Sequence, residues 1–199
     1  SGKSLRSVRK HYCPGCGHNV AHAIVGQVID ELDVRERTIG TAPVGCAVLL
    51  YDYFDFDIIE CAHGRCPATA TAIKRLQSDN LVFTYQGDGD LAAIGMAETI
   101  HAANRSENIT IVFINNAIYG MTGGQMAPTT MTGQITTTTP GGRGQNQEGP
   151  PIKMCELLNA LGGPVYLERV AVDSSEHVQQ ARAAVKKAFT YQLENKGFS

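Results

Sequence analysis

Two groups of residues in this 199-residue chain have types and spacings that could do chemistry. The first is Cys13 and Cys16, a Cys-x-x-Cys pair whose thiols could bind zinc, form a disulfide or hold a redox centre. The second is Gly-Asp-Gly at 87–89, followed by the asparagine pair at 115–116. Carboxylate and amide oxygens are ligands that Mg²⁺ prefers. The sequence therefore offers candidates for a thiolate centre and for a magnesium site.

Predicted secondary structure places the Gly-Asp-Gly sequence at a ligand-binding edge. A buried strand is predicted at 80–86 and a helix at 91–105, so the glycines lie at the carboxyl end of a strand, where α/β sheets bind ligands. The N-terminus of the following helix offers free N–H groups to a phosphate. A strand at 108–116 then returns Asn116 to the same edge as Asp88. The pattern predicts a site for a magnesium diphosphate.

The rest of the chain alternates between helices and strands. Further helices are predicted at about 18–32, 67–77, 152–161 and 175–194, and further strands at 36–42, 55–62 and 165–172. Residues 119–151 are rich in Gly, Thr, Pro and Gln and predict a long loop, of a length that is usually functional or disordered. The alternation predicts a doubly wound α/β fold, with a mostly parallel sheet and helices on both faces.

Composition narrows the class of protein. With 43% hydrophobic and 18% charged residues, we expect a single domain over residues 1–199 that includes the N-terminal cysteines. The sequence has no signal peptide and no apolar run that could span a membrane, so we expect a cytoplasmic protein without a membrane partner. A net charge of −2 argues against nucleic acid as a partner. Six cysteines in such a chain favour metal binding or catalysis over disulfides.

Longer motifs around these residues resemble the β subunit of 2-oxoacid:ferredoxin oxidoreductases. In order, they are YCPGCGH, APVGCAVLLYDYF, HGR, FTYQGDGDLAAIG and NNAIYGMTGGQMAPTT. The similarity runs from Tyr12 to the final helix and is closest to the branch that acts on 2-oxoisovalerate or 2-oxoglutarate. It implies a thiamine diphosphate-binding fold and an enzyme that is catalytic only with a partner subunit.

The resemblance also implies a set of cofactor-binding residues. Magnesium would be bound by Asp88, Asn116 and the carbonyl oxygen of Ile118. The other residues implied to lie at the cofactor are Cys46, His63, Gly87, Gly89, Asp90, Gly120, Met121 and Thr122. For Asp90, the ordinary role of a carboxylate at a helix N-terminus is an alternative, and both roles are compatible.

Cys13, Cys16 and Cys46 match three ligands of the 4Fe-4S cluster of this family. Their spacing alone allows zinc as well as iron and sulfur, and the resemblance favours iron and sulfur. In the family the fourth ligand follows the final helix, so we expect the chain to be incomplete at the C-terminus and this ligand to lie beyond Ser199. The remaining cysteines, Cys61, Cys66 and Cys155, are expected to be small buried residues.

The implied reaction is the oxidative decarboxylation of a 2-oxoacid to acyl-CoA and CO₂. Electrons would pass to ferredoxin, and coenzyme A would be a co-substrate. The glutamate that activates thiamine is implied to come from an α-type partner subunit, in an assembly that can include γ and δ subunits. Residues 47–49 contain no cation for a second carboxylate, which favours 2-oxoisovalerate. Two alternatives stay open: a non-oxidative thiamine diphosphate decarboxylase or synthase, and a structural module that binds zinc.

Overall fold

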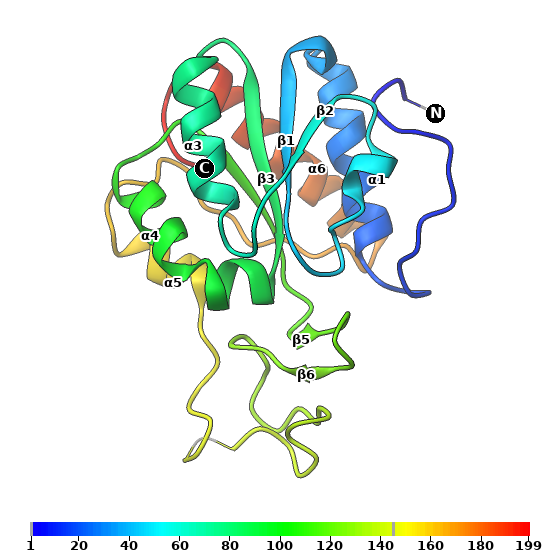
Figure 1. The fold of residues 1–199 in the computed structure, drawn as a ribbon, viewed down its shortest axis with the longest axis vertical. Coiled ribbons are helices and arrows are strands. Elements are labelled where there is room, and N and C mark those ends of the chain that lie inside the picture. The colour runs from blue at the N-terminus through cyan, green and yellow to red at the C-terminus, as the bar shows by residue number, and fades with distance from the viewer. Residues whose placement is uncertain (1, 145) are drawn as a thin grey trace.

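A four-stranded parallel sheet is the centre of the computed structural model, which describes residues 2–144 and 146–199 (Figure 1). Its strands are β1 (Thr38–Ala42), β2 (Asp57–Glu60), β3 (Leu81–Gly87) and β4 (Thr110–Ile114). Their spatial order is β2-β1-β3-β4, so the chain first moves outward from β1 to β2 and then crosses to the other side of β1. In open parallel sheets, the point between β1 and β3 where the direction changes is a ligand-binding position.

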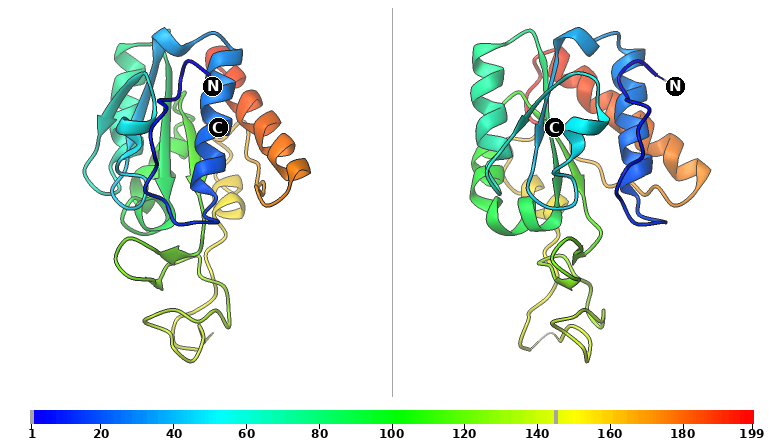
Figure 2. Two further views of the ribbon diagram at one scale, coloured as in Figure 1. Left: turned by 90° about the vertical axis from the view of Figure 1, so that its right-hand side faces the viewer. Right: turned by 45° about the vertical axis from the view of Figure 1, so that its right-hand side comes forward.

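Helices cover both faces of this sheet (Figure 2). One face carries α1 (His18–Glu31) and α6 (Ser175–Leu193); the other carries α3 (Cys66–Leu76), α4 (Met96–Asn104) and α5 (Met154–Asn159). A short helix that the sequence did not predict, α2 (Leu50–Tyr53), precedes β2. Successive side chains of β3 point to opposite faces, so that Phe83 packs toward α1 and α6 and Val82 toward α3 and α4. The predicted doubly wound α/β fold is confirmed.

None of the helices in the described part of the chain is long and apolar enough to cross a lipid bilayer.

The predicted helix at 91–105 is interrupted. Residues Asp90–Ile94 form a π-helical turn, and α4 begins only at Met96. Gly95 lies between them, and a Cβ atom there would overlap the carbonyl oxygen of Asp90 and lie 2.8 Å from that of Gly64. Only glycine fits this contact, which packs the loop after β2 against the start of the helix. Single π-helical turns are often found at functional sites.

The predicted strand at 165–172 is wrong. This segment has no regular secondary structure and pairs with no strand of the sheet in the described chain. The end of the chain lies beside β4 instead, because Ser199 N–H donates to Ile109 O (3.1 Å) and Ile111 N–H donates to Ser199 O (2.8 Å). The N–H of Val165 in turn donates to Phe198 O (2.9 Å). The residues at 165–172 suit a strand by type, but a strand also needs a neighbour to pair with.

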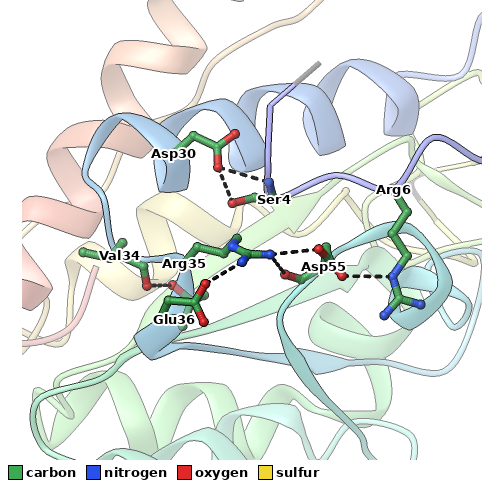
Figure 3. Close-up of polar contacts among 8 residues, drawn as sticks. Ser4, Arg6, Asp30, Val34, Arg35, Glu36 and Asp55 are labelled. Carbon is green, nitrogen blue, oxygen red and sulfur yellow. Dashed lines mark hydrogen bonds and ion pairs between the residues drawn. The ribbon is translucent and has the colours of Figure 1, made fainter.

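The N-terminal segment is tied to the body of the protein through α1 and the loop before β2 (Figure 3). Both the N–H and the hydroxyl of Ser4 donate to Asp30 Oδ1, at 3.0 and 2.6 Å. Arg6 and Arg35 both pair with Asp55, at 3.5 and 2.8 Å. From this anchor the segment runs along the outside of α1 to its first residue (Figures 1 and 2). The Cys-x-x-Cys turn is thereby placed near the edge of the sheet where the strands end.

A histidine of α1 lies in the core without contact to solvent. His22 is 0% exposed and packs against the rings of Tyr53, Phe54 and Tyr85. Its Nε2 lies 2.7 Å from the Tyr12 hydroxyl. Burial, followed by repulsion from neighbouring positive groups, lowers the pKa of His22 from 6.5 to about 3. The folded protein therefore holds this imidazole in its neutral form.

We predict that the protein loses stability in mild acid because of His22. Its pKa is lower in the folded than in the unfolded state, so its contribution is complete above pH 6.5 and is lost as the pH falls toward 3. The full loss, reached only near pH 3, is about 5 kcal/mol, of which about 3 kcal/mol falls above pH 4.5. Urea unfolding between pH 7.5 and 4.5 measures it. His22→Gln should reduce the slope with pH, whereas the exposed His101→Gln should not; equal slopes in both variants would contradict the assignment.

Candidate functional site

A cavity of about 310 Å³ lies at the carboxyl ends of the parallel strands. Its walls come from the segments that follow β1, β2, β3 and β4. Every residue that the sequence predicts to bind the cofactor lines this cavity: Cys46, His63, Gly87, Asp88, Gly89, Asp90, Asn116, Ile118, Gly120, Met121 and Thr122. The fold thus brings together residues separated by up to 76 positions (122 − 46) in the sequence. Their role toward a cofactor stays a prediction.

Asp88 lies at the centre of the predicted metal site, directly after β3. Asp88 is 4% exposed, so its side chain is buried. Oδ1 accepts from Gly89 N–H at 2.8 Å, and Oδ2 accepts from Ile118 N–H at 2.9 Å. Burial raises the pKa of Asp88, and the two N–H donors oppose this effect. The bond to Ile118 joins the Gly-Asp-Gly turn to the turn that carries the asparagine pair.

The asparagine turn has an unusual backbone. Ala117 has a φ of 61°, in the left-handed region that non-glycine residues seldom adopt. The Thr130 hydroxyl donates to Ala117 O at 2.6 Å, and the Thr129 hydroxyl donates to Asn115 Oδ1 at 2.7 Å. Asn115 Oδ1 also accepts from Ala117 N–H at 3.1 Å. These contacts hold the strained turn in place and leave the neighbouring Asn116 exposed at the cavity.

The residues that clamp this turn belong to a long excursion, residues 118–151, which we call the arm. It projects away from the carboxyl edge of the sheet (Figure 1). It starts with a short hairpin of β5 (Ile118–Tyr119) and β6 (Gln125–Met126), which the sequence did not predict. The described part of the arm otherwise contains no helix or strand, as predicted for a loop.

Arg143 organises the arm from within. It is 4% exposed, and its guanidinium donates only to backbone carbonyl oxygens. Their residues are Ala127, Pro128, Thr130, Glu148, Gly149 and Pro150, at 2.6 to 3.3 Å. One side chain thus connects the two halves of the arm. Because Thr130 is among its partners, Arg143 also supports the asparagine turn.

The lining of the cavity fits a magnesium diphosphate. A Cβ atom built on Gly87 would meet no atom within 4 Å, so the backbone there is open to a ligand. At Gly89 a Cβ atom would come within 2.9 Å of the Tyr119 ring, so a larger residue would disturb the turn. Asp88, Asn116 and Ile118 offer carboxylate, amide and carbonyl oxygens at one wall, which is the hard donor set that Mg²⁺ selects.

We predict that Gly87→Ala leaves the fold intact and weakens binding of thiamine diphosphate. The added methyl group meets open space in the apo protein but takes up space beside the diphosphate site. We expect a loss of roughly 10-fold or more in affinity by calorimetry, with a change of less than about 1 kcal/mol in unfolding free energy. Gly95→Ala is the matched contrast, because there the methyl group meets backbone and should destabilise the fold. Unchanged affinity in Gly87→Ala would place the diphosphate elsewhere.

The three cysteines predicted as cluster ligands lie in one region of the structure. Cys13 is exposed, and Cys16 and Cys46 are partly buried. Burial raises the pKa of the Cys46 thiol, and the proximity of Cys16 and Cys13 adds to this rise. In residues 2–144 and 146–199, no three His, Cys, Asp or Glu side chains converge as a single bound metal ion would require. Of the other cysteines, Cys61 and Cys66 are buried as predicted, whereas Cys155 is only partly buried.

Asp90 lies at the helix N-terminus and at the cavity, as the sequence suggested, but its side chain has further partners. It lines the cavity, but its side chain is fully buried and its oxygens are already occupied. Oδ1 accepts from His63 Nδ1–H at 2.6 Å and from the N–H groups of Gly64 (2.9 Å) and Val44 (3.3 Å). Oδ2 accepts from Gln86 Nε2–H at 2.7 Å. Asp90 thus positions His63 and does not cap the helix with its side chain.

Sequence reasoning also missed two side chains of the cavity wall that carry polar groups. His18 and Tyr119 both line the cavity. His18 follows the Cys-x-x-Cys motif directly, and Tyr119 lies within the predicted loop, so the only available signal was their proximity to residues already selected.

The family profile described as "Thiamine pyrophosphate enzyme, C-terminal TPP binding domain" matches residues 43–199. The chain belongs to this thiamine pyrophosphate enzyme family. The match contains β2, β3 and β4 and the turns that follow β1 to β4 at the cavity, and it confirms the predicted fold. Thiamine diphosphate, another name for thiamine pyrophosphate, is thereby supported as the ligand class of this domain.

The names of individual relatives support the resemblance found in the sequence. The chain is 50% identical over 189 residues to the ketoisovalerate oxidoreductase subunit VorA of Methanothermobacter thermautotrophicus, covering 95% of this chain and 40% of the relative. It is 36% identical to the 2-oxoglutarate synthase subunit KorB of Methanocaldococcus jannaschii, covering 94% and 66%. This chain thus spans about two fifths of the length of the VorA relative.

A solved structure of a 2-oxoglutarate:ferredoxin oxidoreductase from Magnetococcus marinus, with 2-oxoglutarate, coenzyme A and succinyl-CoA bound, has the same fold. The TM-score is 0.85 at 27% identity, covering 98% of this chain and 64% of that one. The predicted resemblance to subunits of 2-oxoacid:ferredoxin oxidoreductases is confirmed.

Proposed function

We propose that this chain is the thiamine diphosphate-binding β-type subunit of a 2-oxoacid:ferredoxin oxidoreductase. The observation that carries the proposal is the joined pair of turns at the cavity, in which Asp88 Oδ2 accepts from Ile118 N–H at 2.9 Å. This bond brings the oxygens of Asp88, Asn116 and Ile118 to one wall. The reaction would be the oxidative decarboxylation of a 2-oxoacid to acyl-CoA and CO₂, with ferredoxin as electron acceptor.

Different residues of the cavity would bind different parts of the ligand. Asp88, Asn116 and the Ile118 carbonyl would hold Mg²⁺, while the open backbone at Gly87 would lie against the diphosphate. Gly120, Met121 and Thr122 would cover the ligand from the start of the arm. When bound, thiamine diphosphate supplies the carbanion chemistry that removes CO₂. The protein would supply orientation and a wall that shields the ligand from water.

The similarity to 2-oxoacid oxidoreductase subunits favours a 4Fe-4S cluster over zinc at the cysteines. The spacing of Cys13, Cys16 and Cys46 alone allows either centre. Each thiolate of an iron-sulfur cluster binds a different iron, so Cys13, Cys16 and Cys46 need only lie around a common space. The proposal places the protein in the cytoplasm, where thiols that are free in the structure stay reduced.

The proposal also requires a partner subunit. No glutamate is among the described residues that line the cavity, so the group that activates the aminopyrimidine ring would come from an α-type subunit. Ferredoxin and coenzyme A would bind to the assembled enzyme. Magnetococcus marinus 2-oxoglutarate:ferredoxin oxidoreductase, with coenzyme A bound, supports coenzyme A as the acyl acceptor.

The cavity favours 2-oxoisovalerate over 2-oxoglutarate. Its described lining contains no lysine or arginine that could pair with a second carboxylate, and it includes Val44, Ala47 and Ile114. An apolar substrate side chain could pack on such a wall without a loss of binding free energy. A second carboxylate would be buried there without a charged partner, which costs binding free energy. The high identity to a ketoisovalerate oxidoreductase subunit supports the same choice.

Anaerobic analysis of the co-expressed complex tests the proposal. We expect iron and acid-labile sulfide, bound thiamine diphosphate and a brown absorbance near 400 nm that bleaches on reduction. Reduction of a viologen dye should depend on coenzyme A and be faster with 2-oxoisovalerate than with 2-oxoglutarate. Zinc without iron would favour the structural module, and thiamine diphosphate without iron would favour a non-oxidative decarboxylase or synthase.

A further inference from the structure

His18 is the second histidine that lines the cavity, and the proposed function gives it no role. It is 2% exposed and is the first residue of α1, and it lines the cavity together with Cys46 and Asp88. The ring of Tyr12 stacks on its imidazole, with centroids 4.4 Å apart and planes at 7°. His18 Nδ1 lies 3.0 Å from the Tyr85 hydroxyl. The ring is therefore fixed in place by two aromatic neighbours.

The contact with Tyr85 determines which nitrogen of His18 carries the proton. Tyr85 is fully buried at the centre of β3, so its hydroxyl hydrogen needs an acceptor within the protein. His18 Nδ1 is the one acceptor that this hydroxyl has among the described residues. A hydroxyl that donates to Nδ1 requires this nitrogen to be unprotonated, and a neutral imidazole then carries its hydrogen on Nε2.

The Nε2 atom of His18 faces the cavity. Nε2 has no hydrogen-bond partner among the described residues. It also keeps some accessible surface, unlike the fully buried unpaired atoms of the described chain. Tyr12 covers one face of the ring and Tyr85 covers Nδ1, so Nε2 is the polar atom of His18 left to open to the cavity that this residue lines. A bound ligand with an oxygen atom at this place would receive a hydrogen bond.

His63, the other histidine of the cavity, is held in the opposite way. Its Nδ1 donates to Asp90 Oδ1 at 2.6 Å, because a carboxylate can only accept. In the neutral ring, Nε2 of His63 is then an acceptor. Of these two side chains, His18 is thus the one that can donate without taking up a proton.

We propose that His18 is a ligand-binding residue whose Nε2–H, fixed by Tyr85 as a positioning residue, donates to an anionic oxygen bound in the cavity. This inference extends the proposed function. The oxygen would belong either to the diphosphate of the cofactor or to the carboxylate of the 2-oxoacid. Both present the same chemistry to the donor, and binding measurements separate them.

Nitrogen NMR of the ¹⁵N-histidine-labelled protein tests the tautomer without any ligand. His18 is assigned by the signals that disappear in His18→Gln. We expect a pyridine-type Nδ1 and a pyrrole-type Nε2, and a mixture of tautomers in Tyr85→Phe. A proton on Nδ1 in the native protein would overturn the proposal. Because no cofactor is needed, this result is independent of whether the proposed function is correct.

His18→Phe and His18→Gln form a matched pair for binding. Phenylalanine keeps the ring that stacks on Tyr12 but has no donor, whereas the Gln amide can place an N–H near the position of Nε2. Kd is measured for thiamine diphosphate with Mg²⁺, and KM for 2-oxoisovalerate in the assembled complex with a viologen dye. A loss of a hydrogen bond to an anion should change one of them by roughly 10- to 100-fold in His18→Phe, with recovery in His18→Gln.

The two sources of the oxygen give different results. An increase in Kd for thiamine diphosphate identifies a phosphate oxygen, and an increase in KM alone identifies the 2-oxoacid. If His18→Phe is folded by circular dichroism and changes neither constant, the proposal is wrong. Should this variant fail to fold, Tyr85→Phe takes its place: a change in His18 tautomer with both constants unchanged would overturn the binding role. A native protein that binds no thiamine diphosphate would instead refute the proposed function.

Discussion

Replacing Asp88 with asparagine is expected to lower the affinity for thiamine diphosphate with Mg²⁺ by at least roughly 100-fold. Asp88 is the single carboxylate of the proposed ligand set, and substitution of even an indirect partner of a metal site commonly costs 10- to 100-fold in affinity. The amide of asparagine carries no charge to offset that of the cation. Isothermal titration calorimetry at fixed Mg²⁺ concentration measures the effect, and tyrosine fluorescence is an alternative because the chain has no tryptophan.

The same substitution should leave the metal-free protein folded. Burial disfavours the charged form of Asp88, so loss of the charge removes a cost to the fold, but the asparagine amide can accept only one of the N–H bonds from Gly89 and Ile118. The two effects oppose each other, and we expect the unfolding free energy of Asp88→Asn to stay within about 2 kcal/mol of the native value. The exposed Asp79→Asn is the control for general charge effects. Normal cofactor binding by folded Asp88→Asn would remove Asp88 from the metal site.

Arg143→Met should release the arm. The guanidinium donates to six carbonyl groups, and hydrogen bonds of charged donors contribute about 1.5 to 3 kcal/mol each when buried. Methionine has a similar length but leaves these oxygens without a donor. We expect the free energy of local opening of the arm to fall by roughly 3 kcal/mol or more. Amide hydrogen exchange of residues 127–150 measures this change directly.

Two comparisons sharpen the test of Arg143. Arg143→Lys keeps the charge but cannot reach all six carbonyl oxygens with one ammonium group, so its effect should be intermediate. Arg169→Met removes an exposed ion pair with Glu156 and should change exchange little. Because Thr130 links the arm to Ala117, thiamine diphosphate affinity should fall in Arg143→Met as well. Fast exchange confined to a few residues around position 143 would contradict the clamp.

The sequence predicted those site residues whose chemical type suits a ligand and which directly follow a predicted strand. Gly87 and Asp88 follow a continuous apolar strand, and Asn116 follows the next one, so the parallel order of β3 and β4 brings them to the same edge. Local patterns were sufficient here because each turn is fixed by its own strand. His63 was predicted at the cavity by the resemblance of its motif to the family and not by a local pattern.

The parts that were missed depend on partners distant in sequence. Tyr85 and His18 are 67 residues apart, and His63 and Asp90 are 27 residues apart, so no local pattern connects them. The buried role of Arg143 was invisible because its partners are backbone carbonyls, which every residue has. Likewise, the residue types at 165–172 predicted a strand, but they could not show that the end of the chain would occupy the place beside β4.

The two oxygen-bearing turns of the site are supported very differently, and this has a consequence for affinity. Asp88 extends from β3, which is buried on both faces and opens only when the whole domain unfolds. The turn with Asn116 is instead held by Thr129 and Thr130 of the arm, which we expect to open without the rest of the domain. Only the fraction of molecules with a closed arm would present the complete metal site, so the observed Kd equals the intrinsic Kd divided by that fraction. Any subunit that packs on the arm would then tighten cofactor binding without touching the cofactor.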